Sequence, residues 1–206
     1  MDNLKSVPLE AHWVSLGAKM VPFAGYSMPL QFEGIKAEHI AVRTQVGLFD
    51  VSHMGEVELR GPNALRSASK LFTNDIRKLQ DGQAMYTAMC IEDGGIVDDL
   101  VVYRISEERI FVCVNASNRE KDFEHMRTHA GFDTEVLDVS EDWAQLALQG
   151  PNSVALLSEL TDFDLNSIPF YRAAFGDVAG VGGVLISRTG YTGEDGFELY
   201  IPSESA

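Results

Sequence analysis

The chain has 206 residues, of which 45% are hydrophobic and 23% charged, a composition typical of a folded globular protein with one or two domains. Asp and Glu outnumber Lys and Arg by 31 to 16, and the net charge of −15 argues against nucleic acid as a general partner. No apolar run reaches the roughly 18 residues that cross a bilayer. The first residues resemble neither a secretory nor a transit signal, so we expect a cytoplasmic protein.

The first 50 residues combine helical and loop patterns. Residues 8–16 have the spacing of a short helix, and residues 20–29 contain two prolines and a glycine, which predicts a rigid apolar loop. Residues 33–46 predict a second helix, ended by Gly47, with His39 among the apolar residues of one face. A lone histidine in such a stripe is more often a core residue than a ligand. Taken together, these patterns predict that residues 1–50 form an N-terminal helical and loop segment of the folded core.

One pattern occurs twice: a short strand, then a Gly-Pro pair, then the start of a helix. It begins at Val57 with Gly61-Pro62 and again at Leu146 with Gly150-Pro151. The pattern predicts an α+β fold of antiparallel sheets with helices packed on one face. We expect a first α+β subdomain at 51–140 and an incomplete second one at 141–206, although a repeat this short could also arise by chance.

Three β-favouring runs form the centre of the chain, at Tyr86–Ile91, Ile96–Tyr103 and Ile110–Val114. Asp93-Gly94-Gly95 separates the first two runs, and the pattern predicts an antiparallel meander. A helix from about residue 117 to His129 follows it, opened by a capping box. Cys90 and Cys113 lie in these apolar runs without a CxxC neighbour or nearby histidine, which predicts buried thiols and no zinc site.

The middle run carries two adjacent acids, Asp98 and Asp99, on opposite faces of an otherwise apolar strand. An unpaired buried carboxylate costs several kcal/mol. At least one of the two therefore needs a partner or a ligand. The alternative is that one forms a salt bridge with an arginine while the other ends the strand early in water.

The last segment has a glycine at every third position, Gly190, Gly193 and Gly196, between two strand patterns. Such a loop lets the backbone approach a ligand closely, but Glu194 and Asp195 argue against phosphate. Glu198 follows on the second strand. It could accept two hydrogen bonds from a flat amine-bearing ring, or it could face solvent on an edge strand.

Five blocks in order resemble the N-terminal part of the glycine cleavage system T protein family, the folate-dependent aminomethyltransferases. They are KMVPFAGYSMP, VRTQVGLFDVSHMGEVELRGP, GGIVDDLVVY, LALQGP and SRTGYTGEDGFELY. The resemblance implies transfer of an aminomethyl group from the lipoyl arm of the partner H protein to tetrahydrofolate, giving 5,10-methylenetetrahydrofolate and ammonia. It implies no metal, flavin or pyridoxal phosphate.

The resemblance also assigns residues. Asp99 matches the family's key acid, a desolvated carboxylate that takes up a proton or stabilises a developing iminium. Glu198 matches the glutamate that holds the amino edge of the pterin. The positions that line the folate site in the family are occupied here by Met54, Tyr86, Val101, Tyr103, Asn115 and Tyr191.

Members of the family continue beyond the point where this chain stops, at Ala206. They complete the second domain, with an arginine expected to meet the folate, and add a C-terminal β-barrel, which we expect to be absent here. A non-catalytic folate-binding or interaction fragment is therefore the alternative function. Basic residues are concentrated in one stretch, at Arg66, Lys70, Arg77 and Lys78. This stretch is interpreted either as a docking patch or as a solvated helix face.

Overall fold

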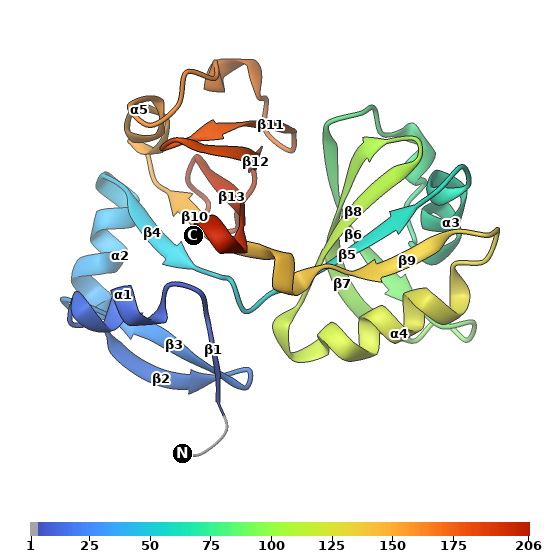
Figure 1. The fold of residues 1–206 in the computed structure, drawn as a ribbon, viewed down its shortest axis with the longest axis horizontal. Coiled ribbons are helices and arrows are strands. Elements are labelled where there is room, and N and C mark those ends of the chain that lie inside the picture. The colour runs from blue at the N-terminus through green and yellow to red at the C-terminus, as the bar shows by residue number, and fades with distance from the viewer. Residues whose placement is uncertain (1–3) are drawn as a thin grey trace. The chain divides into compact units, whose positions relative to one another are not determined.

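The computed structural model describes residues 4–206, which form two compact units, each with its own antiparallel sheet (Figure 1). The inserted unit is the continuous stretch Met54–Glu141. The split unit consists of the part of the chain before Met54 and of Asp142–Ala206. This is the α+β arrangement that the sequence predicts.

The sheet of the inserted unit has the strand order β6-β7-β8-β5-β9, and all of its pairings are antiparallel. Its first three strands are the predicted meander, which is confirmed. Positive φ at the β6–β7 turn occurs at Gly94, with φ of 88°. The strands are β5 (Gly55–Arg60), β6 (Gln83–Cys90), β7 (Ile96–Ser106), β8 (Arg109–Val114) and β9 (Glu135–Asp138).

Helices cover one face of this sheet because their apolar residues share a core with the inward side chains of the strands. Ala68 of α3 and Met126 of α4 are fully buried there against Val57, Val102 and Val112. The capping box predicted before α4 is not formed, because Asn118 precedes the helix without a side-chain cap. The helical elements are α3 (Ala64–Leu71), η1 (Ile76–Lys78), η2 (Ala116–Asn118) and α4 (Arg119–His129).

The split unit contains a five-stranded sheet, β11-β12-β13-β10-β4, and a small sheet, β1-β3-β2. The larger sheet packs Leu148, Ile186 and Phe197 against Leu157 of α5. The elements are β1 (Lys5–Ser6), α1 (Glu10–Ser15), β2 (Lys19–Phe23), β3 (Tyr26–Gln31), α2 (Ile35–Thr44), β4 (Gly47–Asp50), β10 (Trp143–Gln149), α5 (Ser153–Ser158), η4 (Leu165–Ser167), β11 (Ala173–Val178), β12 (Val181–Ser187), β13 (Gly196–Pro202) and η5 (Ser203–Ser205). The short helix η3 (Ser140–Asp142) spans the boundary in sequence between the two units.

Three expectations for the first 50 residues are wrong. Residues 20–29 form the β2–β3 hairpin, with Ala24 and Gly25 at positive φ in its turn, and not an irregular loop. His39 is exposed on α2 and does not fill a core position. Gly47 begins β4 instead of capping α2, which ends at Thr44.

The two Gly-Pro pairs sit at equivalent turns, where a strand ends and the chain reverses into a helix. Gly61 has φ of 116° and Gly150 has φ of 136°. A Cβ atom at Gly150 would lie 2.5 Å from the carbonyl oxygen of Gln45 and 2.9 Å from that of Val42. Glycine is therefore required at residue 150 both by its φ angle and by the backbone packed against it.

Gly150→Ala is expected to lower the free energy of unfolding by about 2–4 kcal/mol, because strained φ and a clash with backbone add together. Urea denaturation measures the loss. The matched control is Gly180→Ala, since Gly180 has φ of 82° but no atom within 4 Å of the added Cβ. The control should cost only about 1 kcal/mol; equal losses in the two variants would contradict the packing argument.

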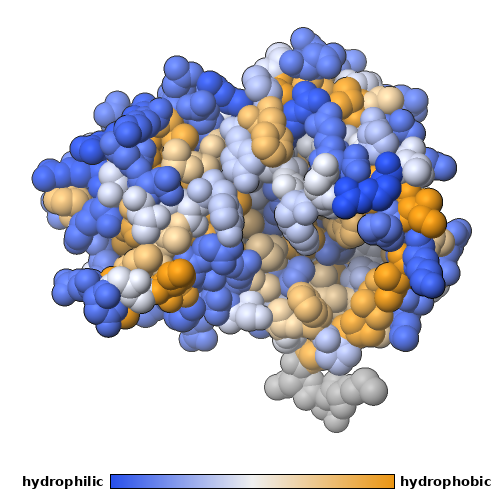
Figure 2. Space-filling view, turned by 180° about the vertical axis from the view of Figure 1, so that it is seen from behind, coloured by the Kyte–Doolittle hydropathy of each residue, from blue (hydrophilic) through white to orange (hydrophobic). Residues whose placement is uncertain are grey.

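Hydrophilic and hydrophobic residues are interspersed over the face of the molecule shown in Figure 2. Several large apolar side chains are exposed in the split unit, among them Phe23, Ile35 and Leu48. Among residues 4–206, no helix is long and apolar enough to cross a membrane.

Candidate functional site

The two acids of β7 lie in different environments. Asp98 is 7% exposed on the face that carries the helices, whereas Asp99 is exposed on the opposite face. The expectation that Asp99 is the desolvated acid is wrong for this structure, since burial falls on Asp98. The strand also continues to Ser106, so neither acid ends it.

Asp99 is held by two neighbours that the sequence analysis assigns to the same site. The Tyr86 hydroxyl donates to Asp99 Oδ2 at 2.5 Å. Asn115 Nδ2 donates to the main-chain oxygen of Asp99 at 2.9 Å and approaches Oδ1 at 3.4 Å. Both carboxylate oxygens therefore have a polar contact, yet the group stays open to solvent.

The sheet register brings the other assigned residues of this unit to the same face. Val101 follows Asp99 by two positions and lies opposite Tyr86 of β6 and Cys113 of β8. Tyr103, two positions further, is 1% exposed. Met54 immediately precedes β5, whose Gly55 pairs with Val114, so in register it lies beside the residue that follows β8. These residues, the acid and its two hydrogen-bond partners are called the Asp99 face.

Glu198 belongs to the split unit and lies on β13, between β12 and β10. The edge-strand alternative is therefore wrong. One of its oxygens accepts from Gln145 Nε2 at 3.0 Å, and the other accepts from the Thr189 hydroxyl. Burial raises the pKa of Glu198, against the opposing effect of these two hydrogen bonds. Tyr191, assigned to the same site, is 87% exposed.

The glycine-rich loop packs against a protein side chain, Gln149. A Cβ at Gly190 would lie 2.1 Å from Gln149 Oε1, and one at Gly196 would lie 2.6 Å from Nε2. Gln149 Nε2 donates to the carbonyl oxygen of Thr189 at 3.0 Å. The close approach that the glycines permit is thus to the buried glutamine, which braces the loop just before Glu198.

The two acids of this loop are paired with arginines. Glu194 accepts from Arg43 at 2.8 Å, and Asp195 accepts from Arg188 Nε at 2.9 Å. Both acids of the loop are therefore engaged in ion pairs, whereas Glu198 on β13 accepts from the neutral donors Gln145 and Thr189.

Sequence reasoning missed several buried polar residues around these positions. Gln145 and Thr189 contact Glu198, and Asp122 lies fully buried beneath β7. Glu56 is 1% exposed, and burial raises its pKa well above the usual range. Asp122 falls in a strongly polar helical stretch, and Glu56 alternates with Glu58 in β5, so local pattern gave no signal that distinguished them from surface acids.

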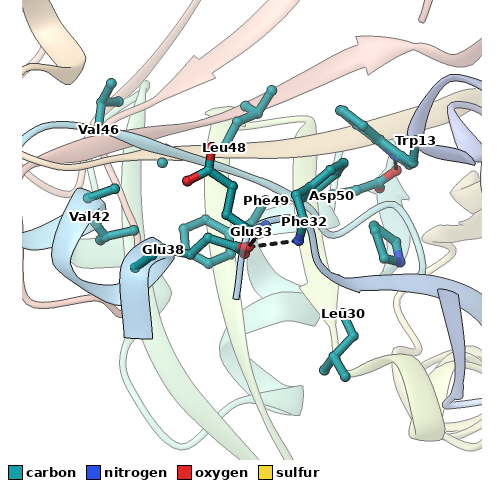
Figure 3. Close-up of a pocket in the computed structure, with 14 residues that line it drawn as sticks. Trp13, Leu30, Phe32, Glu33, Glu38, Val42, Val46, Leu48, Phe49 and Asp50 are labelled. Atoms are coloured by element: carbon teal, nitrogen blue, oxygen red, sulfur yellow. Dashed lines mark hydrogen bonds between the residues drawn. The ribbon is translucent and has the colours of Figure 1, made fainter. Parts of the chain in front are cut away.

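A groove of about 430 Å³ in the split unit is a second candidate (Figure 3). Its acids are already used: Glu38 Oε1 accepts from three backbone N–H groups between Phe32 and Gly34, and Asp50 accepts from the Trp13 indole at 2.5 Å. What remains is apolar surface, which offers contact area but no reactive group. The apolar lining includes Trp13, Leu30, Phe32, Val42, Val46, Leu48 and Phe49.

Among the described residues, no cluster of three His, Cys, Asp or Glu side chains is arranged to hold a metal ion. The chemistry that the side chains themselves offer is that of carboxylates. Asp99 can accept a proton or stabilise a nearby cation, and Glu198 can accept hydrogen bonds from paired donors.

Comparison with known proteins gives concordant matches. The family model described as the GCVT N-terminal domain matches residues 9–206. An aminomethyltransferase of Listeria monocytogenes serotype 4b (strain CLIP80459) is 52% identical over 207 residues, covering 100% of this chain and 57% of the relative. One of Geobacillus kaustophilus (strain HTA426) is 53% identical over 204 residues, covering 98% of this chain and 56% of the relative. The chain thus spans little more than half the length of the curated relatives it matches.

Solved structures agree. The glycine cleavage system aminomethyltransferase T from Bartonella henselae has a TM-score of 0.90 at 36% identity, covering 98% of this chain and 55% of that chain. The heterotetrameric sarcosine oxidase from Corynebacterium sp. U-96 shares the fold, with a TM-score of 0.58 at 18% identity over 82% of this chain and 83% of that chain. On the family match and the whole-chain identity to aminomethyltransferases, the chain belongs to the GCVT N-terminal domain family.

Proposed function

We propose that the protein transfers an aminomethyl group from the lipoyl arm of H protein to tetrahydrofolate. The carbon–sulfur bond to the arm and the carbon–nitrogen bond to ammonia break. Two carbon–nitrogen bonds to the folate form. The products are 5,10-methylenetetrahydrofolate, ammonia and dihydrolipoyl H protein, and no electron donor or acceptor is needed because the carbon keeps its oxidation level.

The observation that supports this proposal most is the open carboxylate of Asp99, fixed by the Tyr86 hydroxyl and by Asn115. A carboxylate that is fixed by two hydrogen-bond donors and remains exposed to solvent can bind a cationic amine. Its negative charge would stabilise the iminium ion that develops during the transfer. The same group can take the proton that an attacking folate nitrogen must lose. Asp99 is thus proposed as the catalytic residue.

Glu198 is proposed to hold the amino edge of the pterin. Each of its oxygens accepts one hydrogen bond from the protein, and a carboxylate has about four lone-pair sites, so it can still accept a pair of N–H donors. Gln145 and Thr189 would fix the carboxylate plane for that bidentate contact. Tyr191 and the Asp99 face, through Met54, Val101 and Tyr103, are proposed to line the folate site.

Glu198→Gln is expected to weaken tetrahydrofolate binding by about 1.5–3 kcal/mol, roughly 10-fold to 150-fold, because one of the two charged acceptor oxygens is replaced by a neutral NH2 group that donates. Isothermal titration calorimetry measures the change. Glu204→Gln, which alters an exposed glutamate near the end of the same segment, is the matched control. Unchanged affinity in Glu198→Gln would rule out the pterin-edge role.

The alternative is a folate-binding or interaction module without catalysis, favoured by the partial coverage of the relatives. Two measurements on the 206-residue chain separate the two functions: calorimetric titration with tetrahydrofolate, and formation of methylenetetrahydrofolate with aminomethylated H protein. Binding with transfer supports the enzyme. Binding without transfer supports the module, and absence of both contradicts each of them.

The basic patch of Arg66, Lys70, Arg77 and Lys78 is proposed as the docking surface for an acidic lipoyl carrier. Two members also stabilise the fold: Arg66 lies over the Phe132 ring at 3.9 Å, and Lys70 donates to the carbonyl oxygen of His129 at 2.8 Å. Arg77 pairs with the neighbouring Asp75, so Arg77 and Lys78 can be changed without disturbing the contacts of Arg66 and Lys70.

Charge reversal at Arg77 and Lys78 is expected to slow association with H protein about tenfold at low salt, since long-range attraction speeds encounter and salt screens it. Stopped-flow kinetics at two ionic strengths measures the effect. Reversing Lys19 and Lys36, two exposed lysines of the split unit, gives a control with the same net charge change. An association rate equal to that of the control would contradict the docking role.

A further inference from the structure

A fully buried carboxyl group lies beneath the Asp99 face. Asp122 of α4 is 0% exposed, and neither of its oxygens has a hydrogen-bond donor among residues 4–206. Lys121 Nζ is 3.8 Å from Oδ1, beyond hydrogen-bond distance, and it donates instead to the carbonyl oxygen of Val97 at 2.6 Å. A carboxylate without donors is costly in such a position, so the group needs a proton of its own.

The neighbour that can accept that proton is Asp98. Its two oxygens each lie 3.2 Å from Asn115 Nδ2, and Asp122 and Asn118 also contact it. Burial by itself would raise the pKa of Asp98, but the hydrogen bonds from Asp122, Asn118 and Asn115 together lower it. Asp98 is therefore the charged member of the pair and Asp122 the protonated one.

Asn115 connects this pair to the opposite face of the sheet. The same Nδ2 group that contacts Asp98 donates to the main-chain oxygen of Asp99 at 2.9 Å and lies 3.4 Å from its Oδ1. An amide nitrogen has two hydrogens, so Asn115 can donate one to Asp99 and the other to the Asp98 carboxylate. The position of the Asp98 carboxylate therefore affects the orientation of the Asn115 amide. The contacts run without a break from Asp122 through Asp98 and Asn115 to Asp99.

We propose that Asp122 and Asp98 share one proton, and that through Asn115 this buried pair positions the Asp99 carboxylate. Asp122, Asp98 and Asn115 are positioning residues, and the consequence for catalysis rests on the proposed function of Asp99. When Asp122 loses its proton, two carboxylates face one another in the core, Asp98 shifts away, and Asn115 no longer holds Asp99 in place.

The environment of Asp122 is consistent with a protonated Asp122 carboxyl group at neutral pH. Burial raises the pKa of Asp122 to about 8, and the adjacent Asp98 adds to the shift by hydrogen bonding and by charge, against a smaller opposing effect of Lys121. The facing charged groups are Asp98 from β7 and Lys121 from α4 itself. The strands packed against α4 present Val57 and Leu59 from β5, and Val136 with Asp138 from β9; the Asp138 carboxylate accepts from Ser140.

The test is an NMR titration of the 206-residue chain labelled in its aspartate carboxyl and asparagine side-chain groups. The Asp122 carboxyl resonance is expected to titrate with a midpoint near pH 8, and the Asn115 side-chain amide should move with the same midpoint. In Asp122→Asn both changes should vanish, while Asp162→Asn, an exposed position in the split unit, should leave them intact. Asp98→Asn should move the Asp122 midpoint down by at least one pH unit.

A titration of Asp122 near pH 4 would overturn the shared proton, and a pH-invariant Asn115 amide would overturn the positioning. Transfer activity gives a separate readout. The wild-type rate should fall above about pH 8, and Asp122→Asn should keep its rate there with KM unchanged. Absence of transfer in both proteins at every pH would count against the proposed function, and the resonance titrations would then still decide this inference.

Discussion

Asp99→Asn is expected to lower the rate of methylenetetrahydrofolate formation by about 10²–10⁴-fold, the usual contribution of a positioned acid–base group. The amide keeps the shape of the side chain and an oxygen that accepts from the Tyr86 hydroxyl. What it removes is the negative charge that is proposed to stabilise the iminium, and the ability to take up a proton. The loss should therefore appear in kcat, with KM for tetrahydrofolate changed little.

The control for this prediction removes a carboxylate of equal charge elsewhere. Asp162→Asn changes an exposed side chain of the split unit and should leave kcat within about twofold of the wild type. A rate for Asp99→Asn equal to that of the control would remove Asp99 from the mechanism. Circular dichroism of both variants shows whether the sheet is intact, so a folding defect is distinguishable from a catalytic one.

The central meander was predictable because its pattern is local. Period-two alternation marks β7, and the Gly94 turn marks the connection to β6. That two adjacent acids on such a strand need partners also followed from the sequence. Which of them is buried did not, because both faces of this strand are apolar in sequence and only the positions of α3 and α4 distinguish them.

The partners of the two key carboxylates could not be predicted, because they come from distant segments. Gln145 lies 53 positions from Glu198, and Asn115 lies 17 positions from Asp98. Asp122 falls in a helix whose composition is strongly polar, so its burial arises only from the placement of α4 on the sheet. The side-chain periods of strands (2.0 residues) and helices (3.6 residues) predict which residues share a face of an element. They do not predict which element packs against which.

The glycine-rich loop shows the same limit. Its spacing predicted close backbone approach, which is present, but the approaching group is the side chain of Gln149 and not a ligand. The hairpin at residues 20–29 was not predicted because prolines argue against a strand. In the structure, Pro29 lies opposite Met20, next to a shift in the register of the β2–β3 pair.

Asp122→Asn is expected to flatten the dependence of stability on pH. The pKa of Asp122 is raised from about 4 to about 8 in the folded protein, so its contribution is fully present below the unfolded pKa and is lost as pH rises through the folded pKa. Between pH 5 and pH 8 the folded state keeps a proton that the unfolded state has lost. The free energy of unfolding of the wild type should therefore fall by roughly 1.4 kcal/mol per pH unit from this group alone.

The variant should lack that slope and should be more stable than the wild type at pH 8 by about 2–4 kcal/mol, because the asparagine amide donates to Asp98 without taking up a proton. Asp98 itself, whose pKa is lowered, loses its contribution only as pH falls below the usual aspartate range, so it adds no slope between pH 5 and 8. Glu56, the other acid of this unit whose pKa is raised by burial, is present in both proteins, so the difference between their slopes measures Asp122. Urea denaturation followed at the amide resonances of β7 reads the inserted unit by itself. Glu120→Gln, an exposed change on the same helix, should keep the wild-type slope, and an equal slope in Asp122→Asn would show that Asp122 is charged in the folded protein at neutral pH.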